Sequence, residues 1–271
     1  MKNNKFNGYT NKIKLKNNKI IKTYKIKKDD YLDKLNEFIV LTIFKEMEQD
    51  VIIKPIEILY KKNKLISSFV YLKDYNDLSN LKLNNVNIDF ITKLIKSFHS
   101  IKNDNFHKVK TFNYSKTLNF FIKNLKKPFC NLDKITYEII VELDKLKGSK
   151  KVISHNDLVP GNILFNNNKY LFIDYDYVMM NYKYFDYASL ITETLNEDEK
   201  SINYFIDNLI KNKMLLPIQS EFDKLNIIIR YQDLLWSLWA NYMFEKTKKE
   251  IFHKIYKDKY ERLKKRIIIT F

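Results

Sequence analysis

The sequence predicts an α+β protein of two lobes, a small β-rich N-terminal lobe and a larger, mainly helical C-terminal lobe. Three observations support this prediction. Residues 1–72 read as strands around one helix, residues 73–83 are polar and typical of a hinge, and helical periodicity dominates from residue 86 onward. We therefore expect an N-terminal lobe at residues 1–75 and a C-terminal lobe at residues 76–271.

The N-terminal lobe starts with two basic, β-rich runs within residues 1–28, which turn at residues 16–19. A helical pattern begins at Asp29-Asp30, with apolar residues recurring at helical spacing up to Ile43. Two further strands follow, at residues 51–59 and 65–72. The expected result is a small sheet with one helix.

The C-terminal lobe is predicted to be a series of helices interrupted by two short strands. The strands lie near residues 151–154 and 163–173. The helices are expected at residues 88–101, 114–125, 132–146, 184–194, 197–212, 221–246 and 250–267.

Composition favours a folded protein of the cytoplasm. The chain has 271 residues, of which 45% are hydrophobic, enough for a sizeable core. Its one cysteine, Cys130, excludes an internal disulfide and a zinc site built from a cysteine cluster. No apolar run approaches the ~18 residues of a membrane span, and the N-terminus lacks the apolar core of a signal peptide.

The net charge of +17 raises the possibility of a nucleic-acid partner. The positive residues, however, are nearly all lysines spread along the chain beside many asparagines, and the only arginines are Arg230, Arg262 and Arg266. Base and phosphate recognition favours arginine, whose planar group forms paired hydrogen bonds. We therefore expect no specific nucleic-acid binding.

One stretch of the C-terminal lobe, residues 157–174 and below called the catalytic stretch, carries an ordered set of polar residues suited to phosphoryl transfer. Asp157 is followed by Asn162, and an apolar, aromatic run then leads to Asp174. Transfer of a phosphoryl group from a magnesium nucleotide needs one carboxylate to orient a hydroxyl and two oxygen ligands for the metal. The alternative is that Asp157 and Asn162 are turn residues and that Asp174 caps a strand.

Candidates for nucleotide contacts lie in the N-terminal lobe. Lys22 falls on an early strand, from which it could reach the phosphates, and Glu37 on the next helix could pair with it. The first strand–turn–strand contains Gly8, Thr10 and Asn11, small residues that could approach a phosphate although they form no glycine-rich loop. The alternative, in so lysine-rich a chain, is that Lys22 is a solvated side chain.

Two residues near the catalytic stretch are expected to support it. His155 is interpreted as bracing the loop by hydrogen bonding, not as a proton carrier. Asp186, at the start of a helix, could cap that helix or bond back to the loop.

Aromatic residues indicate a possible acceptor site. Trp236 and Trp239 are the only tryptophans and stand at i, i+3 on one predicted helix. Their two indole faces side by side could form a wall for a quaternary ammonium, and Tyr177 is a further candidate wall. The alternative is ordinary core packing.

Taken together, these motifs resemble a known family. The segments SHNDLVPGNILF, FIDYDY and FDYASLITE, dense over residues 154–193, resemble the choline/ethanolamine kinase family and its bacterial choline kinase branch. That family belongs with the aminoglycoside phosphotransferases to the protein-kinase-like superfamily. Looser matches are NGYTN, FHS at residues 98–100 and YQDLLWSLWANY.

The resemblance implies a bilobal protein-kinase-like fold and assigns roles by position. Asp157 would be the catalytic base, Asn162 and Asp174 would bind Mg²⁺, and Lys22 would bind ATP. The choline site would be lined by an acid at Glu193 and by the aromatic pair. The family usually has glutamate where this chain has Asp176, which puts any second metal contact there in doubt.

The sequence thus predicts an ATP- and Mg²⁺-dependent kinase that converts choline to phosphocholine. Ethanolamine kinase or an aminoglycoside-type phosphotransferase is the alternative within the same class. A non-catalytic basic binding module with a kinase-like fold is the alternative of another class. The sequence leaves open ATP against GTP, the oligomeric state and any function of the lysine-rich surface.

Overall fold

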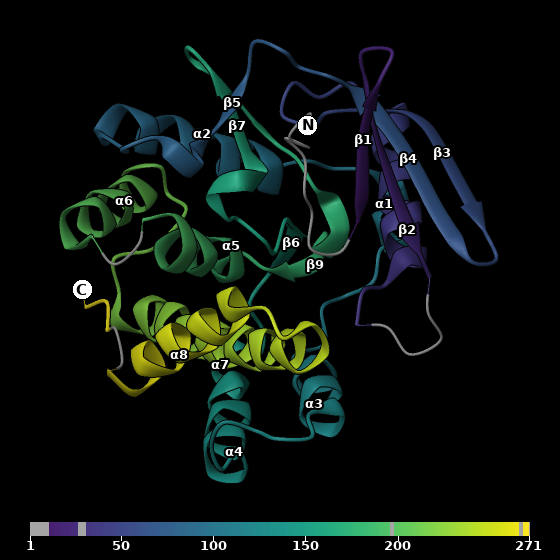
Figure 1. Ribbon diagram of the computed structural model, residues 1–271. Helices are drawn as coiled ribbons and strands as arrows, with labels where there is room; N and C mark the ends of the chain where they lie inside the picture. The colour runs from purple at the N-terminus through teal and green to yellow at the C-terminus, as the bar shows by residue number, and fades with distance from the viewer. Residues whose placement is uncertain (1–10, 27–30, 196–197, 266–267, 271) are drawn as a thin grey trace.

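The computed structural model describes residues 11–26, 31–195, 198–265 and 268–270. It has the predicted α+β character, with a small sheet and one helix beside a larger helical lobe (Figure 1). The N-terminal sheet is antiparallel, in the order β1-β2-β4-β3. Its strands are β1 (Lys12–Lys16), β2 (Lys19–Lys25), β3 (Pro55–Lys61) and β4 (Lys64–Val70). A lobe boundary at residue 75 stays a prediction.

Local sequence explains the start of this lobe. The turn between β1 and β2 is formed by Asn17 and Asn18, both with positive φ (50° and 57°), a conformation that asparagine tolerates well. Helix α1 (Lys34–Glu46) begins where the Asp33 side chain accepts a hydrogen bond from the Asn36 amide. The helix therefore starts later than predicted, and the predicted start at residues 29–30 lies outside the described residues.

The predicted hinge contains structure that ties it to the C-terminal lobe. The short strand β5 (Asn76–Asp77) pairs with β7 (Ile163–Asn166), which pairs in turn with β8 (Lys169–Phe172). The single strand predicted at residues 163–173 is thus wrong: it is a hairpin that turns at Asn167, where φ is 49°. A second pair joins β6 (Lys151–Ser154) to β9 (Met179–Tyr182), a strand that was not predicted.

The helices of the C-terminal lobe surround these short strands (Figure 1). They are α2 (Asn85–His99), α3 (Tyr114–Asn124), α4 (Asp133–Glu142), α5 (Tyr184–Ser189), α6 (Glu199–Lys211), α7 (Gln219–Thr247) and α8 (Glu250–Lys265). The predicted helix at residues 184–194 changes after Ser189 to a π-helical turn, Leu190–Thr194. No helix in the described ranges has the length and apolar character to cross a membrane.

Helix α7 forms the centre of this lobe. It is buried on several sides, and its side chains pack with those of α3, α5 and α8 in one continuous apolar core. Helix α8 lies along α7 (Figure 1). This packing brings the last helix of the described chain beside the segment that follows the catalytic stretch.

Candidate active site

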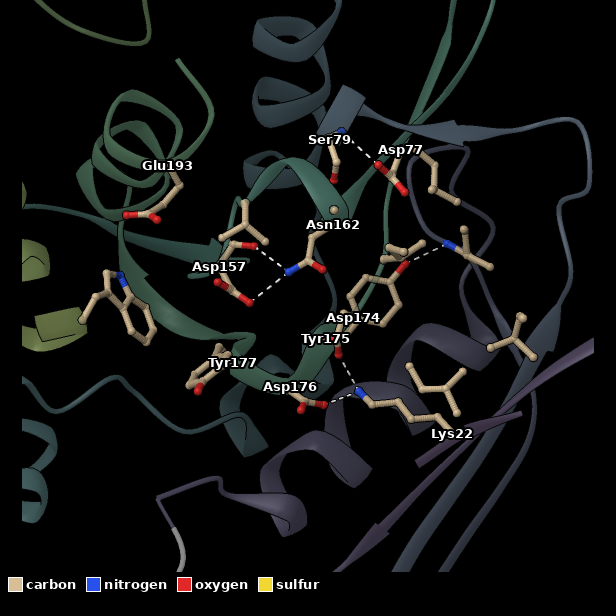
Figure 2. Close-up of a pocket in the computed structure, with 18 of the residues that line it drawn as sticks. Lys22, Asp77, Ser79, Asp157, Asn162, Asp174, Tyr175, Asp176, Tyr177 and Glu193 are labelled. Atoms are coloured by element: carbon tan, nitrogen blue, oxygen red, sulfur yellow. Dashed lines mark hydrogen bonds and ion pairs between the residues drawn. The ribbon is translucent and has the colours of Figure 1, made fainter. Parts of the chain in front are cut away.

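One pocket of about 1180 Å³ is lined by residues of both lobes, including several residues of helix α8. Most of the predicted site residues line it, several of them shown in Figure 2: Lys22, Glu37, Asp157, Asn162, Asp174, Asp176, Tyr177, Glu193, Trp236 and Trp239. His155 and Asp186 lie behind the wall of the pocket, where both are fully buried. Gly8 and Thr10 lie outside the described residues.

Asp157 and Asn162 face each other across one tight loop. The Asn162 Nδ2 donates to the Asp157 backbone carbonyl and to Asp157 Oδ2, both at 2.9 Å (Figure 2). Pro160 starts the single 3-10 turn that brings Asn162 back toward the aspartate. Because the side-chain nitrogen of Asn162 donates to Asp157, the side-chain oxygen of Asn162 is directed away from this contact.

Asp186 holds the backbone of this loop from behind. Its carboxylate accepts hydrogen bonds from the amides of His155 (2.9 Å) and Asn156 (2.7 Å), and His99 Nε2 lies 2.7 Å away. Burial alone would raise the pKa of Asp186, but its hydrogen bond and electrostatic interaction with His99 hold this pKa below its ordinary value. Of the two roles considered for Asp186, its contacts fit the bond back to the loop.

Asn156 has a left-handed backbone, with φ of 65°, and it is fixed by its own side chain. The Nδ2 donates to the Tyr177 carbonyl at 2.8 Å, and the Oδ1 accepts from Asn181 Nδ2 at 2.7 Å. His155 Nε2 lies 2.9 Å from the Ile173 carbonyl, and burial lowers the pKa of the ring. These contacts fit a bracing role for a neutral His155.

The environment of Asp157 disfavours its charged form. Burial, together with the carboxylates of Asp174, Glu193 and Asp176, raises the pKa of Asp157 well above its ordinary value, and the Asn162 hydrogen bond opposes this effect only in part. A carboxylate whose pKa is raised accepts a proton more readily at neutral pH, a property suited to a general base.

Asp174 follows β8 and has a left-handed backbone, with φ of 64°. The main-chain amide of the preceding Ile173 donates to the main-chain carbonyl of Asn162 at 3.0 Å. Asp174 and Asn162 thus lie on adjoining turns that face the same pocket (Figure 2). A carboxylate and an amide oxygen are hard donors suited to Mg²⁺. Within the described ranges no three His, Cys, Asp or Glu residues form a group that could hold a metal ion.

A buried cluster of charges joins the two lobes at the base of the pocket. Lys22 Nζ on β2 lies 3.1 Å from Glu37 Oε1 and 2.6 Å from Asp174 Oδ1, and it also bonds to Asp176. Burial would lower the pKa of Lys22, but Asp174, Asp176 and Glu37 raise it well above the ordinary value. Lys22 therefore carries a positive charge beside the candidate metal ligands and is not a solvated lysine.

The cluster contains a second lysine that sequence reasoning missed. Lys34, only 3% exposed, lies 2.7 Å from Glu37 Oε2 and 3.0 Å from Asp176 Oδ2. As a residue type Lys34 does not differ from the many other lysines of the chain. A possible signal was the i, i+3 spacing of Lys34 and Glu37 on one amphipathic helix.

Asp176 has a structural partner set of its own. Beside the two lysines it accepts a hydrogen bond from Asn11 Nδ2 at 2.8 Å. Burial would raise its pKa, but Lys22 and Lys34 hold this pKa far below the ordinary value. Asp176, whose side chain is shorter than the glutamate usual in the resembling family, thus remains ionised and binds the two lysines. Asn11 reaches Asp176 and does not line the pocket.

Part of the pocket wall is an apolar slot that was not predicted. Its walls come from the N-terminal sheet, the hinge and the catalytic stretch. They include Ile20, Phe69, Leu72, Leu164 and Ile173. Tyr175 joins β8 to the segment before β3, since its hydroxyl donates to the Phe172 carbonyl and accepts from the Ile53 amide, both at 2.9 Å. An apolar slot beside charged groups suits a flat heterocyclic base.

The aromatic residues predicted to bind the acceptor have a geometry different from the one expected. The rings of Trp236 and Trp239 are 6.2 Å apart but at 89°, so the indole faces do not lie side by side. Tyr177 is likewise perpendicular to Trp236, at 5.7 Å and 86°. The three rings therefore form a corner of faces and edges. Such an arrangement, as in an aromatic cage, suits a cation better than a flat wall does.

Glu193 lies on the π-helical turn after α5 and points into the pocket, on the side of Asp157 (Figure 2). Its carboxylate is bonded to Lys259 of α8, and Arg262 Nη2 lies 3.7 Å away. Thr192 Oγ1 donates to it at 3.1 Å. Sequence reasoning did not anticipate the two cations, because α8 is far from Glu193 in the chain.

Comparison with known proteins bears on the fold and on the family. A model of the phosphotransferase enzyme family matches residues 95–209. The LicA homolog of Mycoplasma capricolum is 31% identical over 157 residues, or 58% of each chain. Protein LicA of Haemophilus influenzae is 25% identical over 184 residues, or 63% of this chain and 66% of the relative. The chain thus spans less than two thirds of the length of these relatives.

Solved structures share the fold over nearly the whole chain. Choline kinase LicA from Streptococcus pneumoniae superposes with a TM-score of 0.75 at 19% identity, over 96% of this chain and 92% of the other. A choline/ethanolamine kinase family protein from Mesorhizobium loti gives 0.72 at 14% identity, over 95% and 85%. The GDP complex of aminoglycoside 2'-phosphotransferase-IIIa gives 0.68 at 10% identity, over 96% and 90%. The predicted resemblance and the kinase-like fold are confirmed.

Proposed function

We propose that this chain, which has the fold of the choline kinase-like phosphotransferases, transfers the γ-phosphate of ATP to the hydroxyl of choline and so forms phosphocholine. What supports the transfer most is the arrangement of Asp157, Asn162 and Asp174 around one pocket, with Lys22 bonded to Asp174. The family match over residues 95–209 supports a small-molecule phosphotransferase.

Asp157 acts as the base of this reaction. The choline hydroxyl donates a hydrogen bond to the Asp157 carboxylate, which orients its oxygen toward the γ-phosphorus and takes the proton as the new P–O bond forms. The Asn162 amide and the loop held by Asp186 keep the carboxylate in place. The bond between the γ-phosphorus and the bridging oxygen breaks, and ADP leaves.

The nucleotide binds between the lobes. Its base enters the slot between Ile20, Phe69 and Leu164, and its phosphates extend toward Lys22, whose charge is secured by three carboxylates. Asp174 and Asn162 would hold Mg²⁺, which would neutralise negative charge on the phosphates. Relatives in complex with AMP, GDP and ADP support nucleotide binding.

Choline binds at the aromatic corner of Tyr177, Trp236 and Trp239. The trimethylammonium group gains from aromatic faces and from burial of its methyl groups, and Glu193 supplies a negative charge nearby. An aminoglycoside, which carries several positive charges, fits less well, because Lys259, Arg262 and Lys265 also line this side. Ethanolamine remains the nearest competitor because it lacks only the methyl groups.

A coupled assay of ADP release tests the proposal. Purified protein with Mg²⁺-ATP is expected to turn over choline with a higher kcat/KM than ethanolamine, and to release little ADP with an aminoglycoside or with no acceptor. A preference for ethanolamine would mean that ethanolamine, and not choline, is the acceptor. Absence of turnover with all amino alcohols would reject the function in favour of the non-catalytic binding module.

A further inference from the structure

On the proposed acceptor side of the pocket, the Glu193 carboxylate already has a positively charged partner from the protein itself. Lys259 Nζ bonds to Glu193 Oε1, and the two side chains are 12% and 15% exposed. Both residues line the same pocket as Asp157 and the two tryptophans. An ammonium group of the protein therefore stands where the ammonium of an acceptor would meet Glu193.

The neighbouring Arg262 differs from Lys259 in how firmly it is held. Arg262 is 6% exposed; its Nε donates to Asp233 Oδ1 at 2.7 Å and its Nη1 to the Thr192 carbonyl at 2.8 Å. These bonds fix its planar group against the turn that carries Glu193. Lys259, by contrast, reaches Glu193 through a flexible stem of four carbons with a compact, strongly hydrated head group. Lys259 can leave while Arg262 stays.

We propose that Lys259 is a displaceable counter-ion that sets the affinity of the acceptor site. The ammonium of the acceptor takes the place of Lys259 at Glu193, and Lys259 returns when the product leaves. This inference rests on the proposed function, since it requires a cationic acceptor. Exchange of one cation for another at Glu193 gains little free energy, because one ion pair is broken as another forms. Net affinity then comes mainly from the aromatic corner.

Lys259→Met tests the inference because it removes the charge and keeps an unbranched side chain. The KM for choline is expected to fall about tenfold, the size of effect expected of a close charge pair in a partly buried site, while the KM for ATP stays the same. The inhibition constant of tetramethylammonium, a cation with no hydroxyl, is expected to fall by a similar factor. Lys257→Met, at an exposed position of the same helix, is the matched control.

The inference is overturned if Lys259→Met folds with the melting temperature of the parent protein and its choline KM is unchanged or raised. A raised KM would mean that Lys259 contacts the acceptor directly. Should the methionine variant fail to fold, Lys259→Gln answers the same question. If the parent phosphorylates no amino alcohol, the proposed function fails. Calorimetric titration of tetramethylammonium into parent and variant then still decides whether Lys259 competes for Glu193.

Discussion

The Asp186 carboxylate accepts a hydrogen bond of 2.7 Å from the amide of Asn156, a residue whose backbone is left-handed. The residue that precedes Asp157 is thus held in an uncommon conformation by a buried charge from helix α5. The position of the proposed base depends on a side chain 29 positions later in the sequence.

Asp186→Asn is expected to lower kcat by about tenfold or more, because an amide cannot accept both backbone hydrogen bonds as well as a carboxylate does. The pH dependence of stability should change as well. Since the pKa of Asp186 is depressed in the folded protein, its stabilisation is complete above its ordinary value of 3.8 and is lost as pH falls through the lower folded value. Urea unfolding of parent and variant below about pH 4 measures this change.

The parent should lose more unfolding free energy than Asp186→Asn over that acidic range, although the variant is less stable at pH 7. If the unfolding free energies of the two proteins fell in parallel as the pH is lowered, Asp186 would not be the source of this pH dependence.

Asp157→Asn separates catalysis from folding. We expect kcat to fall by about two to four orders of magnitude, the usual contribution of a general base. Because the raised pKa shows that the folded protein disfavours a charged Asp157, the neutral variant should be as stable as the parent at pH 7 or more stable. Steady-state kinetics and thermal unfolding check both parts. A clear loss of stability would indicate that Asp157 is mainly structural.

Lys34→Met probes the buried charge cluster. It leaves Glu37 and Asp176 with one lysine fewer in a dry site, so we expect a loss of about 3 kcal/mol in unfolding free energy. The KM for ATP should rise, because Lys22 is drawn more strongly to the remaining carboxylates. Lys45→Met, exposed on the same helix, should change stability by less than about 0.5 kcal/mol. Equal unfolding midpoints for the two variants would contradict this view of Lys34.

Trp236→Ala examines the aromatic corner. It removes the ring that contacts both Tyr177 and Trp239. The expected result is a choline KM raised by about two- to thirtyfold, from a cation–aromatic contribution of roughly 0.5–2 kcal/mol, with a much smaller change in the KM for ATP. The KM for choline should rise less in Trp236→Phe, which keeps an aromatic ring. Equal effects on both substrates would point instead to a folding role for the tryptophan.

Sequence reasoning worked best where the chemistry is contiguous. Asp157, Asn162 and Asp174 lie within one short segment, so their order alone suggested a shared site, and the structure brings them to one pocket. It failed where function depends on contacts between distant segments. Lys34 and Lys259 resemble any other lysine in the chain until the fold places one beside Asp176 and the other beside Glu193.

Local pattern also misled where strands are very short. Strand β9 spans only four residues and exists because it pairs with β6, a stabilisation that no local propensity encodes. The turn at Asn167 was read as part of a continuous strand, although the polar run Asn166–Lys169 interrupts the apolar residues and asparagine favours turns.

The division of the pocket between elements has an evolutionary consequence. The proposed contacts with the phosphate donor come from β2, α1 and the catalytic stretch, whereas helix α8 supplies Lys259 and Arg262 beside the proposed acceptor site. Substitutions on α8 can therefore alter which alcohol is recognised and leave the donor half intact. In descendants of such a chain, acceptor preference would diverge through substitutions on α8 and at Trp236 and Trp239 of α7, while the machinery for transfer stays the same.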